Sequence, residues 1–378
     1  MKKEDYYIDL ILEKCVSFKH SKSLFISYNS YNEGFIQKLL KKLENTKIND
    51  IYLECIDPFY EHDLLANSTC EQIEESKYFD SSIYDEYAKK KAAFLMFVSP
   101  IPGLMNDIDD EKLALVSKIK SSTKKYFVEL ETNYKISWSI LPLYNEYWEK
   151  ELGINNLEDI LYKICKVDKK ASLNWTDQIE RSKSFINKIN KLNLDYIVLE
   201  NGLGTNLKLG LPKNYKFEGV GETEVLVNMP SYEIFTSPDC TKAEGTVYSS
   251  RPLYYNGAVI DDFYLEFKDG KVIKYGAKKG KKILQSIIEY DEGSSRLGEL
   301  AFVESDSPIS KTNIVFKTTL LDENASCHLA LGRGFGNGTK INKSQIHVDF
   351  MFGTDDLKVT GTKDNEEIPI MENGKFII

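Results

Sequence analysis

The chain changes character near residue 190, and this change constrains the fold more than any single motif does. Before it, short apolar runs such as 24–28 and 93–98 alternate with stretches of helical spacing such as 32–44. This alternation is typical of an α/β layer around a parallel sheet. After it, short β-branched and aromatic runs are separated by glycines, and "KDGK" at 268–271 is typical of a hairpin turn.

We therefore expect an α/β N-terminal domain, residues 1–190, followed by a mostly β (α+β) C-terminal domain, residues 191–378. A length of 378 residues fits two domains of ordinary size. The same patterns predict further helices at 5–18, 62–77, 110–120 and 175–193, and a further strand at 51–55.

Composition excludes several classes of partner. A net charge of −9 disfavours nucleic acid, which needs a basic face. The longest apolar run, 92–98, is far shorter than the ~20 residues that cross a bilayer. Acidic residues near the N-terminus, Glu4, Asp5 and Asp9, interrupt the stretch where a secretory signal keeps an apolar core. We expect a cytoplasmic protein with no membrane partner, whose cysteines are free thiols.

The stretch "KSQIHVDFMFG" at 343–353 contains one of only four histidines. His347 stands two places before Asp349, and in a strand residues two apart point to the same face. An imidazole and a carboxylate would therefore project side by side. The pair is either half of a metal site or the polar face of an ordinary strand, and the pattern alone favours the ordinary strand.

Three more residues stand in apolar or glycine-rich surroundings: Glu244 in "TKAEGTVY", Glu299 in "LGELAF" and His328 in "ASCHLALG". A buried carboxylate is expensive unless it is paired or bound to metal. With His347 and Asp349 they make a set of oxygen and imidazole donors that suits Zn²⁺, Mn²⁺ or Co²⁺. One bridging member would allow two ions ~3.5–4 Å apart, an arrangement used for hydrolysis. A solvated glutamate and a satisfied core histidine remain the alternatives, because no H-E-x-x-H motif is present.

Five collinear segments resemble the aminopeptidase T and aminopeptidase S family of metallo-aminopeptidases. They cover much of residues 195–378, whereas the first half matches faintly, around "ISWSILPLYNEYWEKELG" at 136–153. The five segments are "GTNLKLGL" at 204–211, "NMPSYEIFTSPDCTKAEGTVYSSRPLYYNG" at 228–257, "GELAFVESDSPI" at 298–309, "TTLLDENASCHLALG" at 318–332 and "NKSQIHVDFMFG" at 342–353.

The resemblance implies a hydrolase that removes N-terminal residues from peptides by means of a two-metal centre. It implies two divalent ions per chain (Zn, Co or Mn) and a homodimer. The metal ligands that it implies are Glu244, Glu299, His328, His347 and Asp349, the residues already selected on chemical grounds.

One departure from the family concerns Phe335 in "GRGFGNG", which stands where the family carries a catalytic-site tyrosine. Phenylalanine has no hydroxyl to donate to an oxyanion, and one such donor is worth ~10²–10³ in rate. The segment 329–346 is also shorter than is usual in the family. Either Arg333 supplies the missing donor, or turnover is slow, or the chain is a metal-binding relative that binds peptides or acts in assembly. A two-metal phosphoesterase is disfavoured, since no basic cluster accompanies the motifs.

Overall fold

The computed structural model describes residues 2–19, 22–44, 46–221, 223–255, 258–336 and 338–378. The chain divides into two compact units. Unit 1 is Met1–Asp177 with Thr223–Pro230, and unit 2 is Gln178–Glu222 with Ser231–Ile378. The sequence pattern changes near 190, whereas the boundary between the units lies within α10 (Ala171–Lys191). The reason is that Ile186 and Ile189, in the last turns of α10, are buried in the core of unit 2.

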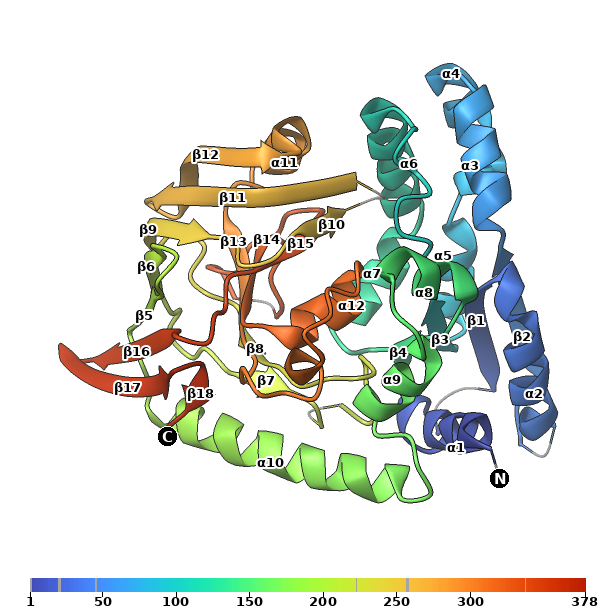
Figure 1. Cartoon of the computed structure of the whole chain (residues 1–378), viewed down its shortest axis with the longest axis horizontal. Helices are drawn as coiled ribbons and strands as arrows, with labels where there is room; N and C mark the ends of the chain where they lie inside the picture. Colours follow the sequence, from blue (N-terminus) through green and yellow to red (C-terminus); the bar gives the residue numbers. More distant parts are fainter. Residues whose placement is uncertain (1, 20–21, 45, 222, 256–257, 337) are drawn as a thin grey trace. The chain divides into compact units, whose positions relative to one another are not determined.

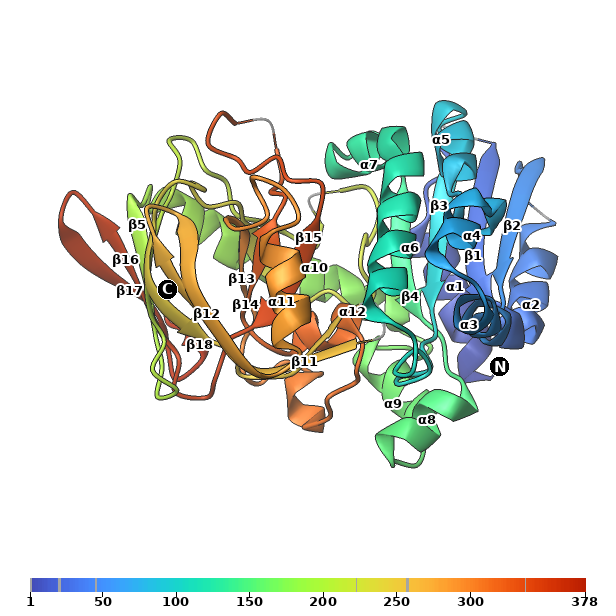
Figure 2. The ribbon, with the colours of Figure 1, turned by 90° about the horizontal axis from the view of Figure 1, so that it is seen from above.

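Unit 1 is built on a four-stranded parallel sheet in the order β2-β1-β3-β4 (Figure 1). The central strands, β1 (Ser23–Asn29) and β3 (Ala93–Val98), bury consecutive apolar side chains, as expected where helices cover both faces (Figure 2). The outer strands are β2 (Asp50–Ile56) and β4 (Trp138–Pro142). The predicted α/β layer with a parallel sheet is confirmed.

The helices of unit 1 follow from amphipathic spacing. In α2 (Glu33–Leu43) the side chains of Ile36, Leu39 and Leu43 are buried together. The helix expected at 62–77 is in fact two, because Thr69 begins a new one by accepting a hydrogen bond from the amide of Gln72. The remaining helices are α1 (Lys3–Leu10), continued by a π-helical turn (Ile11–Cys15), α3 (Pro58–Asn67), α4 (Cys70–Glu75), α5 (Ser82–Lys89), α6 (Asp110–Thr123), α7 (Lys125–Thr132), α8 (Glu146–Leu152) and α9 (Leu157–Ile164).

The segment 223–230 returns to unit 1 because it is bonded to β4. The amide of Ile140 donates to the carbonyl of Val227, and the amide of Met229 donates to the carbonyl of Ile140. The buried hydroxyl of Ser139 also donates to the carbonyl of Leu226.

Unit 2 contains two sheets. The larger, nine-stranded sheet includes the hairpin of β11 and β12 that "KDGK" predicts. Its strands are, along the sheet, β10 (Leu253–Tyr255), β11 (Ala258–Lys268), β9 (Ala243–Tyr248), β6 (Asn206–Gly210), β5 (Tyr196–Glu200), β16 (Lys358–Lys363), β17 (Glu366–Glu372) and β18 (Lys375–Phe376), with β12 (Lys271–Lys279) paired to β11.

The smaller, five-stranded sheet is antiparallel. Its strands in order are β15 (His347–Met351), β14 (His328–Gly332), β13 (Leu297–Phe302), β8 (Ile234–Thr236) and β7 (Glu218–Gly219). The helices of the unit include the part of α10 from Gln178 onward, α11 (Lys281–Ile288) and the single turn α12 (Thr319–Asp322). The mostly β character expected of the second half is confirmed.

The core of unit 2 joins the two sheets. Leu300, Leu329 and Val348 of the five-stranded sheet belong to the same buried cluster as Leu207 and Val247 of the nine-stranded sheet. Because side chains alternate along a strand, the residues between these apolar positions point to the opposite face of the five-stranded sheet. That opposite face carries the polar residues described below.

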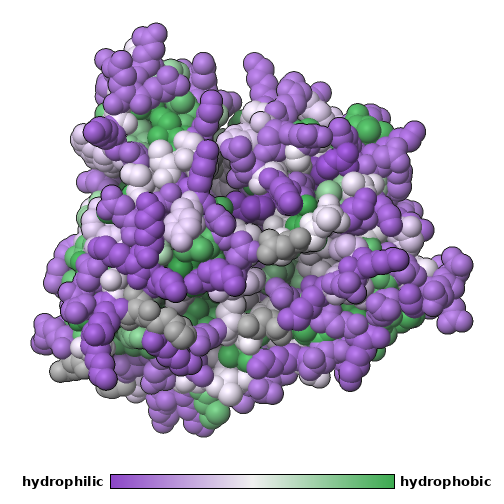
Figure 3. Space-filling model, turned by 180° about the vertical axis from the view of Figure 1, so that it is seen from behind, coloured by the Kyte–Doolittle hydropathy of each residue, from purple (hydrophilic) through white to green (hydrophobic). Residues whose placement is uncertain are grey.

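The molecular surface is mixed. Hydrophilic residues cover most of the face drawn in Figure 3, and apolar residues occur there in small separate groups, as is normal for surface in contact with water. Among the described residues, no helix combines the length and the apolar character that crossing a membrane requires.

Candidate metal centre

Strand register gathers four polar residues on one face of the five-stranded sheet. Glu299 pairs with Ala330, and Ala330 pairs with Asp349, so the two carboxylates flank the alanine. His328 and His347 each stand two residues before a member of this row and therefore share its face. The sequence prediction for Glu299, His328, His347 and Asp349 thus corresponds to one compact cluster.

A fifth residue, Glu233, joins the cluster from the start of β8. Phe235 pairs with Ala301, which in turn pairs with His328. Glu233 stands two residues before Phe235 and lies on the same face. Its carboxylate oxygen Oε2 is 3.2 Å from Nε2 of His328.

The five residues form two groups that share one member. Nε2 of His347 is 3.0 Å from Oε2 of Glu299 and 3.1 Å from Oδ1 of Asp349. Glu233, Glu299 and His328 offer one set of ligand atoms that all lie within 4.8 Å of one another, and Glu299, His347 and Asp349 offer another. Glu299 is the carboxylate common to both groups.

Both histidines are oriented by backbone carbonyls. Nδ1 of His347 lies 2.6 Å from the carbonyl oxygen of Arg333, and Nδ1 of His328 lies 3.1 Å from that of Ser326. A ring whose Nδ1–H donates to a carbonyl presents its Nε2 to the carboxylates. This is the arrangement by which proteins fix the tautomer and the direction of metal-binding imidazoles.

Burial makes the cluster electrostatically demanding. Glu299 is 4% exposed and His328 is 1% exposed. Burial raises the pKa of Glu299, although the hydrogen bond from His347 opposes the effect. Burial alone would also raise the pKa of Asp349, but the charge and hydrogen bond of His347 outweigh it and hold that pKa below its usual value.

The imidazoles show the complementary effect. Burial lowers the pKa of His328, but hydrogen bonding to Glu233 and the nearby carboxylate charges dominate and raise it to about 10. The pKa of His347 is raised well above its ordinary value, because the charges of Asp349 and Glu299 outweigh burial. The carboxylates of the site therefore favour positive charge among them, either on protonated imidazoles or on a bound cation. Two imidazoles and three carboxylates are also a donor set that suits divalent Zn, Co or Mn, so these residues fit a metal centre.

Glu244 does not belong to this cluster. It lies on β9 in the nine-stranded sheet, opposite Lys208 of β6, and its side chain is exposed. Its Oε1 accepts a hydrogen bond from the amide of Asp269, 2.7 Å away, in the β11–β12 turn. The structure therefore does not bring Glu244 together with the other four expected ligands, and Glu233, eleven residues earlier in the same sequence segment, lies beside them instead.

A signal for Glu233 was present in the sequence. In "YEIFTS" the apolar Ile234 is followed by Phe235 and a threonine, which is a short strand pattern with Glu233 at its start. The sequence prediction instead selected Glu244, which stands next to a glycine. Spacing along the chain does not reveal which of two sheets a short strand joins.

Phe335 packs against the centre. Its ring centroid is 5.3 Å from that of His347, in an edge-on arrangement, and 5.3 Å from that of Phe235. Its amide donates to the hydroxyl of Ser237 over 2.7 Å. Gly332, at φ +97°, allows the chain to turn into this loop, since a Cβ there would lie 2.2 Å from the carbonyl oxygen of Ile346. A ring without a hydroxyl thus borders the candidate centre.

Known proteins resemble this chain over its full length. It is 28% identical to Aminopeptidase 2 of Geobacillus stearothermophilus, with 99% of this chain and 98% of that protein covered. It is 29% identical to Aminopeptidase AmpS of Bacillus subtilis, with 98% and 97% covered. The fold matches the solved structure of wild-type AmpT from Thermus thermophilus with a TM-score of 0.87 at 24% identity, over 100% of this chain and 99% of that one.

The family comparison covers the chain almost end to end. The model of the thermophilic metalloprotease (M29) family matches residues 1–376. This match confirms the resemblance that the sequence motifs carry, and it fits the buried cluster of carboxylates and imidazoles. The chain belongs to the M29 family of thermophilic metalloproteases.

Proposed function

We propose that this protein is a metal-dependent aminopeptidase with a two-metal centre formed by Glu233, Glu299, His328, His347 and Asp349. The observation that carries the proposal is the pair of overlapping donor groups, each with two carboxylates and one imidazole, that share Glu299. A shared carboxylate is the arrangement expected of a ligand that bridges two ions. Its relatives' names, aminopeptidases, support the activity.

The side chains and backbone carbonyls around the centre orient its two imidazoles. When bound, divalent ions polarise the scissile carbonyl and lower the pKa of the attacking water. The carbonyls of Arg333 and Ser326 hold the two imidazoles in one orientation. The ring of Phe335 packs edge-on against the ring of His347.

Metal analysis and a substrate panel test the proposal. The protein is loaded with Zn²⁺, Co²⁺ or Mn²⁺ and assayed on aminoacyl chromogenic amides. We expect about two ions per chain, together with release of the N-terminal residue that EDTA abolishes. N-acetylated versions of the best substrate serve as the control and are expected to remain intact. Hydrolysis that is indifferent to EDTA, or cleavage of the acetylated amides, would contradict the proposal.

A second function is favoured by one observation, the phenylalanine ring beside His347. With no hydroxyl at this position, the chain would bind metal and peptides yet turn them over poorly. Two bound ions without measurable hydrolysis would support this binding or assembly role.

The homodimer and the cytoplasmic location remain predictions, together with peptides as the substrate class. Analytical ultracentrifugation of the metal-loaded protein tests the first of these.

A further inference from the structure

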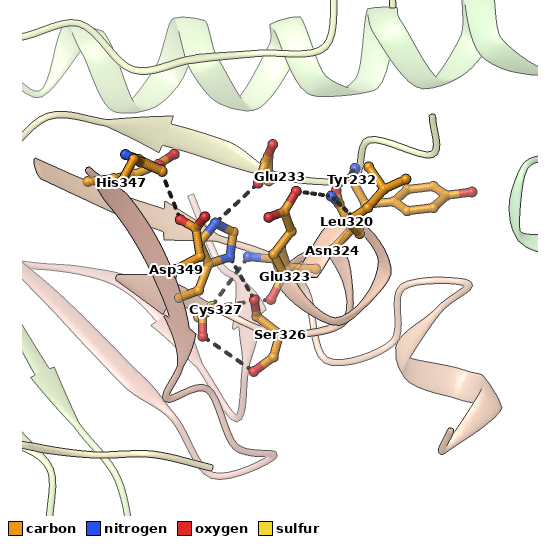
Figure 4. Close-up of polar contacts among 12 residues, drawn as sticks. Tyr232, Glu233, Leu320, Glu323, Asn324, Ser326, Cys327, His347 and Asp349 are labelled. Atoms are coloured by element: carbon orange, nitrogen blue, oxygen red, sulfur yellow. Dashed lines mark hydrogen bonds and ion pairs between the residues drawn. The ribbon is translucent and has the colours of Figure 1, made fainter. Parts of the chain in front are cut away.

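Unit 1 contains a cavity that the proposed function does not use. The candidate metal ligands, among them Glu233, His347 and Asp349 in Figure 4, all belong to unit 2. The cavity of unit 1 has a volume of about 250 Å³. Its walls come from the segments that follow β1 and β4 and from helices α1, α2 and α9. Ligand sites of parallel α/β sheets form outside the carboxyl ends of the strands, which is where this cavity lies.

Asn32 brings a hydrogen-bond acceptor to the cavity. The residue lines the cavity and is only 7% exposed. Its Nδ2 donates to the carbonyl of Tyr144 over 2.9 Å, and because a carbonyl only accepts, this contact fixes the orientation of the amide. Within the described part of the chain, Oδ1 of Asn32 has no donor. A buried acceptor is costly to leave unpaired, so this oxygen favours a ligand that donates a hydrogen bond.

The aromatic walls of the cavity suit a single ring. The centroid of the Tyr7 ring is 5.8 Å from that of Tyr162, edge-on, and 5.9 Å from that of Phe35. Both tyrosine hydroxyls are already bonded, Tyr7 to the carbonyl of Pro142 and Tyr162 to Glu158, each over 3.0 Å. The rings therefore contribute apolar surface. An apolar cavity of roughly 150 Å³ binds benzene, so the larger volume here accommodates a ring with a short chain.

The charges at the cavity favour a cation. Its charged lining residues are Glu4, Lys38 and Glu158, and Lys38 forms an ion pair with Glu4. Burial, followed by the charge of Glu158, raises the pKa of Tyr162 above its ordinary value, so the charge of this carboxylate reaches the wall. A primary ammonium group is a cation that donates three hydrogen bonds and accepts none. It therefore matches both the acceptor of Asn32 and the carboxylate of Glu158.

We propose that this cavity binds a primary ammonium group joined by a short chain to one aromatic ring. The ammonium group would bind Oδ1 of Asn32 and the carboxylate of Glu158, and the ring would pack among Tyr7, Phe35 and Tyr162. The site shares no residue with the candidate metal centre, so the inference does not depend on the proposed function. A free aromatic amine and an aromatic residue at the start of a peptide both offer this chemistry.

The test is a ligand-detected NMR titration of the zinc-loaded protein at pH 7. The probe is phenethylamine, whose amine is protonated at this pH as that of lysine is. Phenethyl alcohol, in which a hydroxyl replaces the ammonium group, is its neutral counterpart. We expect phenethylamine to bind about tenfold more tightly, since hydrogen bonds to charged groups exceed neutral ones by this order. Failure of phenethylamine to bind the wild type would overturn the inference.

The two sources of the ligand are separated by phenylalanine amide, which represents the start of a peptide. It is measured on the EDTA-treated protein, where the proposed function predicts no cleavage. Binding as tight as that of phenethylamine would assign the site to peptide N-termini as well as to free amines. Weaker binding would assign it to free amines.

Gly34 offers a variant that fills the cavity and keeps the fold. It lines the cavity within α2, and a Cβ there would meet no atom within 4 Å. Leucine is also a better helix former than glycine. Gly34→Leu should therefore weaken the binding of phenethylamine by at least about tenfold, because the new side chain takes the space of the ligand. Gly34→Ala is the matched control, which improves the helix in the same way but should leave the affinity unchanged.

Two further substitutions test the contacts of the ammonium group. Asn32→Leu removes the acceptor and should bring the preference for phenethylamine over phenethyl alcohol close to one. Glu158→Gln should lower the preference about two- to threefold, as is usual for an exposed charge. Its matched control is Asp159→Asn, which removes the neighbouring carboxylate, one that pairs with Lys3, and should leave the preference unchanged.

The outcomes separate this inference from the proposed function. Unchanged affinity for phenethylamine in Gly34→Leu would overturn the inference, because the amine would then bind elsewhere. Loss of binding after EDTA treatment, or in His347→Ala, would also overturn it by assigning the amine to the metal centre. Binding that responds to Gly34→Leu in a protein that hydrolyses no peptide would support the inference while the proposed function fails.

Discussion

The two sheets of unit 2 place similar glutamates in opposite environments, one buried and one exposed. On the five-stranded sheet Glu233 and Glu299 are buried beside imidazoles, whereas on the nine-stranded sheet Glu244 projects into solvent and accepts one turn amide. All three stand next to small or apolar residues in the sequence. Convergence of several ionisable groups in a buried place therefore marks a site better than the immediate neighbours of one carboxylate do.

The largest effect on activity is expected from His347→Ala. This change removes the imidazole that contacts both Glu299 and Asp349, and with it the positive charge nearest to these two buried carboxylates. We expect peptidase activity to fall by more than about 10³-fold even at saturating metal. The assay is hydrolysis of the best chromogenic amide, with circular dichroism as the check on folding. Full activity in a folded variant would rule out the centre as proposed.

The next largest effect is expected from Phe335→Tyr, which adds a hydroxyl to the ring that lies against His347. If the scaffold lacks only an oxyanion donor, the turnover number should rise by about 10²–10³ with metal content unchanged. Phe235→Tyr is the matched control, since it adds a hydroxyl to the neighbouring ring of the same aromatic pair. Equal effects of the two substitutions would mean that the position of Phe335 has no special role.

Metal affinity at the five-stranded sheet should depend on pH. The raised pKa values of His328, about 10, and of His347 mean that both rings hold a proton in the metal-free protein at neutral pH. A metal ion must displace that proton, so affinity rises with pH and falls as the pH drops. We expect the combined affinity for two ions to change about 100-fold per pH unit between pH 6 and 8, or tenfold per ion. Zinc titrations in metal buffers would measure the slope, and a flat profile would show that the imidazoles are not ligands.

One matched pair of substitutions tests directly whether Glu233 or Glu244 binds the metal. Glu233→Gln should weaken metal binding by about 10- to 100-fold, because an amide oxygen is a poorer ligand than a carboxylate. Glu244→Gln changes the same atoms on the other sheet and should alter affinity by less than about twofold, since exposed groups with single contacts contribute little. Competition with a zinc chelator measures both. The reverse result would restore Glu244 as the ligand and remove Glu233.

Much of the fold could be predicted from local patterns. Strand–helix alternation indicated the parallel sheet of unit 1, and "KDGK" indicated the β11–β12 hairpin. These features depend on periodicity and turn chemistry, which are local properties. The order of strands in the two sheets of unit 2, and the return of 223–230 to unit 1, depend on contacts between distant segments. No local pattern reports such contacts.

The same limit explains which residues of the site could be predicted from the sequence. Glu299, His328, His347 and Asp349 could be identified because each lies in a strand whose alternation is visible in the sequence. Glu233 directly precedes a strand of only three residues, β8, which is too short for its alternation to stand out.

Ala301 and Ala330 lie on the same face of the sheet as the donors, directly beneath the cluster, and both are fully buried. Side chains this short leave the depth of the centre to be set by the hydrogen-bonded backbone of β13 and β14. Residues in the loop that borders the centre, such as Phe335, can therefore be substituted in ways that alter which peptides enter, while the distances between donors persist. Chemistry and substrate range would then evolve separately, the first tied to the sheet and the second free to drift with the loops.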